Sequence, residues 1–266
     1  MGHITINDFF KKKKNAEKLT LITAYDYTFG RIVDEAGIDA ILVGDSLAMV
    51  VQGFDTTLPV TMDEMIYHTK MVSRATVNAM VIGDMPFMSY QACITDAVYN
   101  AGRFVKEGGA AAVKIEGGIE IIDQIKAIVR SGIPVMGHIG LTPQSVNIMG
   151  GYKVQGKTEE AKQLLIESAD KLQEAGIFSL VLEAVPVTLA KQITQNLKIP
   201  VIGIGAGPDC DGQILVLHDV IGLFDRFVPK FVKRYAQLKP LAISAVKTYI
   251  DEVKNGVFPS EDESFK

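Results

Sequence analysis

The sequence predicts an α/β fold, a (β/α)8 or TIM barrel, from its length, its apolar segments and the helical segments between them. At 266 residues the chain has the size at which such a barrel forms a single domain, about 250 residues. Hydrophobic residues make up 48% of the chain, which is enough for a large core. We therefore expect one domain, residues 1–266, with an N-terminal helix, a C-terminal helix and a short polar tail.

Eight short apolar segments rich in β-branched residues are the predicted strands. Their apolar residues are nearly continuous rather than alternating, which is typical of parallel strands covered on both faces. The eighth is the weakest prediction, because too few residues separate it from the seventh for a full helix. The segments are 19–26, 39–46, 79–86, 111–118, 133–140, 179–186, 199–207 and 212–219.

Amphipathic helical patterns lie between most of these segments, for example over 95–109 and 158–177. Several end at a glycine just before the next strand, as in "EAGI" at 35–38 and 174–177, which is a common helix stop signal. Alternating strands and helices indicate a barrel, with an open doubly wound sheet as the alternative, because alternation alone does not close a barrel. Residues 229–266 read as a helix and a polar tail.

Charge and cysteine content limit the classes of partner. A net charge of −4 and a pI near 5.6 argue against nucleic acid or an anionic membrane as a partner. The basic run "KKKK" at 11–14 is interpreted as a solvated helix face. Cys93 and Cys210 form no CxxC motif and are typical of reduced cytosolic thiols. No apolar stretch approaches the roughly 20 residues that span a bilayer, so we expect a soluble cytoplasmic protein.

Ionisable residues stand where the predicted strands end. In barrels of this kind the chemistry lies at the carboxyl ends of the strands. Strand interiors are apolar by default, so folding alone explains these residues poorly and they predict a functional site. They are Asp26, Asp45, Asp84, Lys114, Glu116, His138, Glu183, His218 and Asp219.

Asp45 and Asp84 each follow a glycine at a strand end. Two carboxylates that converge repel each other unless they share a proton or a cation. Hard oxygen ligands favour Mg²⁺, which often takes one or two carboxylates and leaves its other positions to water and substrate. Glu116 is a candidate third contact, directly or through water. The alternative is that each Asp caps the following helix; the presence of both, with Glu116, favours the metal.

Lys114, His138 and Glu183 are the candidate reacting and binding groups. Lys114 lies two residues from Glu116, so both side chains face the same way. Three roles are open for Lys114: it binds a substrate carboxylate, it forms a Schiff base, or it only forms an ion pair with Glu116. His138 offers an N–H to an anion or carbonyl, or is only structural. Glu183 closes an apolar run where burial raises a carboxyl pKa, which suits a general base; a helix-capping role is equally compatible.

Residues 141–157 form a long, polar, glycine-bearing stretch between a strand and a helix. Loops of this length inside a compact domain are usually functional. We expect a lid over the substrate, with a plain surface loop as the alternative.

Blocks of residues along nearly the whole chain carry a resemblance to a known family. They are "TAYDY" 23–27, "LVGDSL" 42–47, "TLPVT" 57–61, "DMPFMSY" 84–90, "VKIEGG" 113–118, "GHIGLTPQSVNIMGGYKVQGK" 137–157, "LVLEAVP" 180–186, "IPVIGIGAG" 199–207 and "DGQILVLHD" 211–219. In these blocks the sequence resembles the 3-methyl-2-oxobutanoate (ketopantoate) hydroxymethyltransferase family. Ala48 departs from the pattern, since the family commonly has glycine after "GDSL".

The resemblance implies a barrel of the phosphoenolpyruvate-binding type, usually assembled as a homodecamer (a pentamer of dimers). It implies Mg²⁺ on Asp45 and Asp84, with Glu116 completing the site. Ser46, Lys114 and His138 would bind the oxo acid beside the two aspartates, and Glu183 would be the catalytic base.

The implied reaction is hydroxymethyl transfer from 5,10-methylenetetrahydrofolate to 3-methyl-2-oxobutanoate. It gives 2-dehydropantoate (ketopantoate) through a Mg²⁺-stabilised enolate, in the biosynthesis of pantothenate, the precursor of coenzyme A.

Three other functions remain open. A lyase of the same barrel type would split a carbon–carbon bond next to an oxo acid without folate. A Schiff-base aldolase would use Lys114 and need no metal. A non-catalytic oxo-acid-binding protein is the third, and Glu183 argues against it because binding alone has no use for a base.

Overall fold

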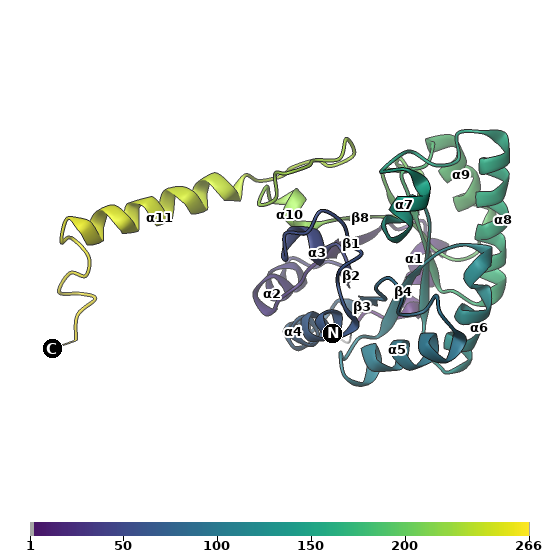
Figure 1. The fold of residues 1–266 in the computed structure, drawn as a ribbon, viewed down its shortest axis with the longest axis horizontal. Helices are drawn as coiled ribbons and strands as arrows, with labels where there is room; N and C mark the ends of the chain where they lie inside the picture. Colours follow the sequence, from purple (N-terminus) through teal and green to yellow (C-terminus); the bar gives the residue numbers. More distant parts are fainter. Residues whose placement is uncertain (1–2, 266) are drawn as a thin grey trace. The chain divides into compact units, whose positions relative to one another are not determined.

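Eight parallel strands close into a barrel in the computed structural model, which describes residues 3–265 (Figure 1). Each strand pairs with the next, and the eighth pairs with the first. All eight fall inside the predicted segments, and closure excludes the open sheet. The strands are β1 (Leu19–Thr23), β2 (Ala40–Val43), β3 (Met80–Asp84), β4 (Ala112–Glu116), β5 (Val135–Gly140), β6 (Ser179–Glu183), β7 (Val201–Ile204) and β8 (Gly212–Leu215).

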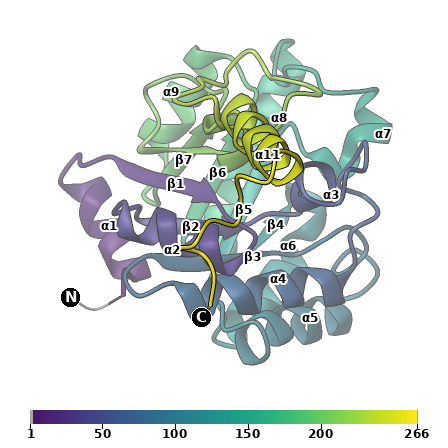
Figure 2. The same ribbon diagram turned by 90° about the vertical axis from the view of Figure 1, so that its left-hand side faces the viewer.

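Helices surround the strands (Figure 2). Those packed around the barrel are α2 (Tyr27–Glu35), α4 (Met62–Ala75), α5 (Ile94–Lys106), α6 (Ile122–Arg130), α8 (Glu159–Ala175) and α9 (Val187–Asn196). α5 and α8 confirm the two helices predicted over 95–109 and 158–177. Short helices lie in the loops: α3 (Leu47–Val50), η1 (Ile119–Ile121), η2 (Pro143–Ser145) and α7 (Val146–Met149). β7 and β8 are joined by a loop, so the strict alternation stops there.

The N-terminal end of the barrel is closed by α1 (Ile6–Lys14). Phe9 is fully buried in the core inside the strands and meets Phe178 edge-on at 5.5 Å between ring centroids. The lysines predicted to form a solvated face are partly engaged: Lys12 pairs with Asp39, and Lys13 Nζ lies 2.6 Å from Asp211 Oδ2. That interpretation was therefore wrong for these two residues, because burial of Phe9 turns part of the basic helix face towards the barrel.

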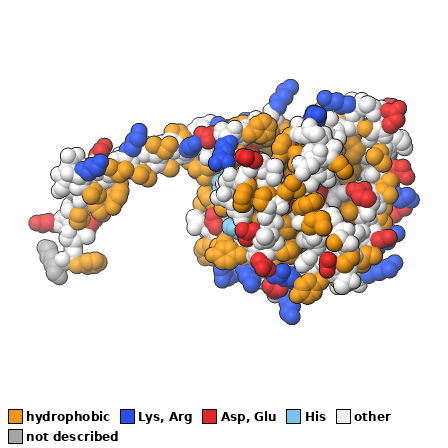
Figure 3. Space-filling model, viewed as in Figure 1, with side chains coloured by type: hydrophobic (Ala, Val, Ile, Leu, Met, Phe, Trp, Pro, Cys, Tyr) orange, Lys and Arg blue, Asp and Glu red, His pale blue; other side chains and the backbone are white. Residues whose placement is uncertain are grey.

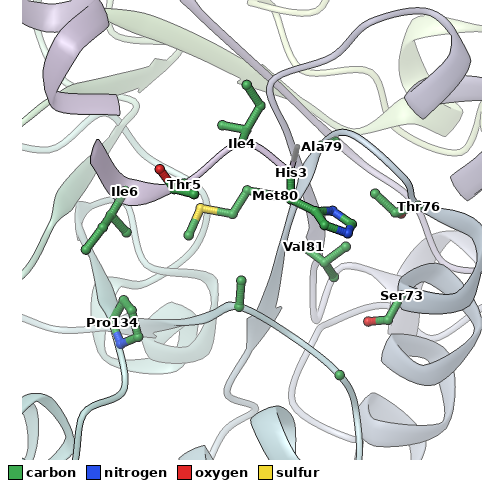
Figure 4. Close-up of a pocket in the computed structure, with 12 residues that line it drawn as sticks. His3, Ile4, Thr5, Ile6, Ser73, Thr76, Ala79, Met80, Val81 and Pro134 are labelled. Carbon is green, nitrogen blue, oxygen red and sulfur yellow. The ribbon is translucent and has the colours of Figure 1, made fainter. Parts of the chain in front are cut away.

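A cavity of about 400 Å³ opens beside α1, where His3, Thr5, Ser73 and Thr76 line it together with the start of β3 (Figure 4). It lies at the amino ends of the strands. In TIM barrels this end serves stability, whereas the chemistry lies at the opposite end.

The chain divides into two compact units, the first running to Val216 and the second beginning at Leu217. The second contains α10 (Leu217–Val220) and α11 (Leu238–Lys254), and α11 is the helix predicted within 229–266. The prediction of a single domain over residues 1–266 stays a prediction. None of the helices within residues 3–265 combines the length and the apolar character needed to cross a membrane.

Asp34 in α2 stabilises the turn that leads into β3. It is buried, and its carboxylate accepts hydrogen bonds from the backbone N–H groups of Val77 (3.0 Å), Asn78 (3.0 Å) and Ala79 (2.7 Å). Burial alone would raise the pKa of Asp34, but these hydrogen bonds outweigh it and lower the pKa. The ionised form is therefore favoured by folding.

We expect Asp34→Asn to lower the free energy of unfolding by about 1–3 kcal/mol at pH 7, because an amide has one acceptor oxygen for these donors. Since the folded-state pKa lies below the unfolded value, the wild-type advantage is complete above pH about 4 and is lost as pH falls through the folded pKa. Urea unfolding at several pH values measures this. Asp170→Asn, on the exposed face of α8, is the control; an equal, pH-independent loss in both variants would contradict the assignment.

Gly83 determines how closely α5 packs on β3. A Cβ atom at this position would lie 2.2 Å from Cδ1 of Phe104, which is fully buried on α5. The ring would have to move in a close-packed layer, and such overpacking is destabilising. The glycine before Asp84 is therefore required by helix packing on the outside of the barrel.

We expect Gly83→Ala to lower the free energy of unfolding by about 1–3 kcal/mol. Gly102→Ala on the same helix is the matched control, since a Cβ there meets no atom within 4 Å. That control should be neutral or stabilising, because alanine is the better helix former. Chemical denaturation measures both, and a Gly83→Ala protein as stable as the wild type would contradict the packing argument.

Candidate active site at the carboxyl ends of the strands

A continuous network of charged side chains crosses the carboxyl ends of β3, β4, β5 and β6. Register places Asp84 beside Lys114 and Glu116 beside His138. Lys114 Nζ lies 2.6 Å from Asp84 Oδ1 and 3.4 Å from Glu116 Oε1. His138 contacts Glu116 Oε1 through Nδ1 and Glu183 Oε2 through Nε2, each at 3.3 Å. The structure therefore brings together five of the residues that the sequence placed at one rim, those at the ends of β3 to β6.

Asp45 joins this network from the end of β2. Its backbone N–H donates to Asp84 Oδ2 at 3.1 Å. Burial, and then the charges of Asp84 and Glu116, raise the pKa of Asp45 well above its usual value. Burial also raises the pKa of Asp84, although Lys114 opposes this. The N-cap positions of the two following helices are instead occupied by Ser46, whose side chain makes no capping hydrogen bond, and by Cys93, so the helix-capping alternative for these aspartates was wrong.

Lys114 is a buried ammonium held among carboxylates. Burial alone would lower the pKa of Lys114, but Asp84, Glu116 and Asp45 outweigh it and raise the pKa. A Schiff base requires the neutral amine, so this environment favours an anion-binding role. The simple Lys–Glu pair is also present, as one contact of the larger network.

His138 is buried between two carboxylates. Burial and the charge of Lys114 favour the neutral ring, but contact with Glu116 and Glu183 outweighs them and raises the pKa of His138 to about 9. Within the described chain neither ring nitrogen makes a hydrogen bond of good geometry. Each nitrogen nevertheless lies 3.3 Å from a carboxylate oxygen, so the ring is paired by charge rather than by well-aligned hydrogen bonds.

Glu183 ends β6 and keeps contact with solvent, with 14% of its side chain exposed, so it is less buried than the sequence predicted. The next residue, Ala184, has a φ of 48°, in the left-handed region that alanine rarely adopts. Such strain is typical of functional sites. Pro186, not Glu183, is the N-cap of the following helix, so the capping alternative for Glu183 was wrong.

Ser46 lies at the edge of the network. Its Oγ is 2.8 Å from the hydroxyl of Tyr25, which is buried. Asp26 lies outside the network and instead caps α2 by accepting from the N–H of Phe29 at 2.8 Å. His218 and Asp219 belong to α10 in the second compact unit.

Sequence reasoning missed two buried residues, Tyr90 and Gln144. Gln144 Nε2 donates to Asp45 Oδ2 at 2.9 Å, and the Tyr90 hydroxyl lies 2.8 Å from Gln144 Oε1. Tyr90 lies in the block at 84–90 and Gln144 in the block at 137–157. Their place in blocks that carry the family resemblance was the one sequence signal that pointed to a role in the site. Ala48, the departure from the family pattern, is fully buried in α3.

The donor set suits a hard divalent cation. Among residues 3–265 no three His, Cys, Asp or Glu side chains are arranged as a ready-made metal site. However, burial and then the charges of Asp84 and Glu116 raise the pKa of Asp45, although Lys114 opposes this, and a cation is one way to stabilise carboxylates placed so close together. Mg²⁺ typically takes one or two carboxylates and completes its shell with water. Asp45 and Asp84 could hold it in this way, with Glu116 reaching it through water.

The loop at 141–157 approaches the network. The charges of Asp45, Glu183 and Glu116, after burial, raise the pKa of Tyr152, so this side chain lies near them. The loop is tied to the end of β6 by the N–H of Gln155, which donates to the carbonyl of Ala184 at 2.9 Å. Its role as a lid stays a prediction.

Comparison with known proteins places the chain in a family. The family model described as ketopantoate hydroxymethyltransferase matches residues 3–261. The 3-methyl-2-oxobutanoate hydroxymethyltransferase of Geobacter metallireducens is 59% identical, covering 98% of each chain. That of Clostridium novyi is 58% identical, covering 98% of this chain and 95% of the relative.

Solved structures share the barrel at low sequence identity. A phosphonopyruvate hydrolase in complex with oxalate and Mg²⁺ matches with a TM-score of 0.63 and 12% identity, over 97% of this chain and 92% of that one. A 2,3-dimethylmalate lyase of the PEP mutase/isocitrate lyase superfamily matches with a TM-score of 0.60 and 18% identity, over 100% and 89%. The fold is therefore the predicted barrel type, and the family match shows that the chain belongs to the ketopantoate hydroxymethyltransferase family of transferase enzymes.

Proposed function

We propose that the chain transfers a hydroxymethyl group from 5,10-methylenetetrahydrofolate to 3-methyl-2-oxobutanoate, giving 2-dehydropantoate (ketopantoate). We place this reaction in the cytoplasm, in the pathway to pantothenate and coenzyme A. Family membership supports the hydroxymethyl transfer. The observation that carries the mechanism is the juxtaposition of Glu183, a partly exposed carboxylate, with the buried cation His138 at 3.3 Å.

The oxo acid binds through its carboxylate and ketone oxygens. Lys114 and protonated His138 supply positive charge in a site of low dielectric, where such contacts are strong. Ser46 offers a hydroxyl oriented by Tyr25. Asp45 and Asp84 would hold Mg²⁺, with Glu116 as a water-mediated contact. The bound cation would act as a Lewis acid that favours the enolate form of the oxo acid.

Glu183 acts as the general base that removes the C3 proton. Its carboxylate stands at the accessible edge of the network, and His138 holds one of its oxygens in place. Lys114 and His138 stabilise the negative charge that develops on the substrate oxygens. C3 then forms the new carbon–carbon bond to the one-carbon unit of the folate, water supplies the hydroxyl oxygen, and tetrahydrofolate leaves.

We also propose that the working form is a homodecamer. α11 supports association, because apolar side chains such as Leu241, Val246 and Tyr249 follow it and the second compact unit does not bury them (Figure 3). Exposed apolar surface of this kind is typical of protein–protein contacts.

We expect the wild-type protein to exchange the C3 proton of 3-methyl-2-oxobutanoate in D₂O without folate, and EDTA to abolish the exchange. Glu183→Gln should lose at least about 100-fold in exchange rate, the usual scale of general-base catalysis, while still binding the oxo acid. NMR measures the exchange. The control is Glu160→Gln, on the exposed start of α8. Exchange at the native rate in Glu183→Gln would show that another group is the base.

A second prediction separates this mechanism from a Schiff-base aldolase. Treatment with the oxo acid and borohydride should leave the protein mass unchanged, because the carboxylates around Lys114 raise its pKa and keep it protonated. Mass spectrometry measures the adduct, and an aldolase with a known Schiff-base lysine is the positive control. A reduced adduct on Lys114 would contradict the proposed chemistry.

A further inference from the structure

Gln144 occupies the centre of the site without carrying charge. It lies in η2, just after β5, and only 4% of it is exposed. Its Nε2 donates to Asp45 Oδ2 and to the carbonyl of Met85, each at 2.9 Å. Its Oε1 lies 2.8 Å from the Tyr90 hydroxyl and 3.2 Å from Gln91 Nε2. Both ends of the amide are therefore engaged by the protein itself.

The same residue connects two of the carboxylates. Its side chain binds Asp45 at the end of β2, and its backbone N–H donates to Glu116 Oε2 at 3.0 Å. Each bond engages only one oxygen of its carboxylate. The other oxygen of Glu116, Oε1, is the one that contacts Lys114 and His138. Gln144 thus fixes the rotation of both carboxylates, directing Glu116 Oε1 at Lys114 and His138 and leaving Asp45 Oδ1 for a further partner.

Met85 and Tyr90 together fix the orientation of this amide. The ring of Tyr90 is fully buried, and its hydroxyl also lies 2.9 Å from the carbonyl of Glu116 and accepts from the Glu116 N–H at 3.2 Å. The carbonyl of Met85 can only accept a hydrogen bond, so Nε2 of Gln144 must face it and Oε1 must face Tyr90. The amide therefore has one orientation, with its donor directed at Asp45.

We propose that Gln144 is a positioning residue, which holds the Asp45 and Glu116 carboxylates in the orientation that binds a divalent cation, with Tyr90 locking its amide. This inference rests on the metal site of the proposed function. Gln144 is not a substrate ligand, because its polar side-chain atoms are already engaged. Outer-shell partners of this type change metal affinity by about 10- to 100-fold when they are removed.

The test measures Mn²⁺ binding to the intact protein by electron paramagnetic resonance, with no oxo acid or folate present. Gln144→Met keeps the size of the side chain and removes its side-chain hydrogen bonds, including the one to Asp45, while the backbone N–H still donates to Glu116. We expect at least about 10-fold weaker Mn²⁺ binding. Gln155→Met is the matched control in the same loop, where the side-chain amide donates to the carbonyl of Lys153. It should bind Mn²⁺ within about 2-fold of the wild type, since no carboxylate loses a partner.

Tyr90→Phe removes only the hydroxyl and keeps the buried ring, so it decides the question if Gln144→Met does not fold. We expect it to weaken Mn²⁺ binding by at least about 3-fold, a smaller loss because it acts through Gln144. Thermal unfolding is recorded for each variant, because a purely structural role would lower the melting temperature and leave the Mn²⁺ affinity of the folded protein unchanged.

Native Mn²⁺ affinity in Tyr90→Phe and in folded Gln144→Met would overturn the proposal. An equal loss in Gln155→Met would also overturn it, because the effect would then come from the loop as a whole. Failure of the wild-type protein to bind Mn²⁺ would overturn the metal site of the proposed function, and the wild-type measurement alone identifies that case.

Discussion

The structure depends on compensating three carboxylates that are buried at one end of an apolar barrel. Asp45, Asp84 and Glu116 are each at most 5% exposed, and burying such groups without partners is costly. Barrel closure supplies partners through strand register, which places Lys114 beside Asp84 and His138 beside Glu116. The compensation is incomplete, as the raised pKa of Asp45 shows. Such a site would favour a bound cation, as the proposed metal site requires.

The same charge distribution would allow one site to bind both a cation and an anionic oxo acid, as the proposed function requires. A cation beside Asp45 and Asp84 would neutralise part of their negative charge. These carboxylates would then attract the Lys114 ammonium less strongly. Lys114 and His138 would then be available to substrate oxygens, which the carboxylates alone would repel. Glu183 stands at the accessible end of this network, where its carboxylate contacts His138. In the proposed mechanism it would therefore exchange a proton away from the groups that would hold the metal.

The fold and most of the site could be predicted because both depend on local patterns. Apolar runs mark strands covered on both faces, and a charged residue at the end of such a run, like Lys114 or Glu183, is visible in the sequence. Gln144 and Tyr90 were missed because a neutral amide and a phenol acquire their roles only from partners far along the chain. Lys12 was misjudged for a similar reason, since its partner Asp39 lies beyond the helix. The capping roles considered for Asp45 and Asp84 could be decided only by the observed caps.

The glycines before the two aspartates show how the packing around a strand end affects the carboxylate that follows it. Consecutive residues of a strand face opposite sides, so Gly83 faces α5 when Asp84 faces the barrel interior. A side chain at Gly83 would meet the buried ring of Phe104, and a Cβ at Gly44 would lie 2.9 Å from Ser46 Oγ. Gly83 therefore lets α5 pack tightly behind the end of β3, and this packing holds the next residue, Asp84, towards the site. Gly44 instead allows the turn after β2 to bring Ser46 close to the strand end.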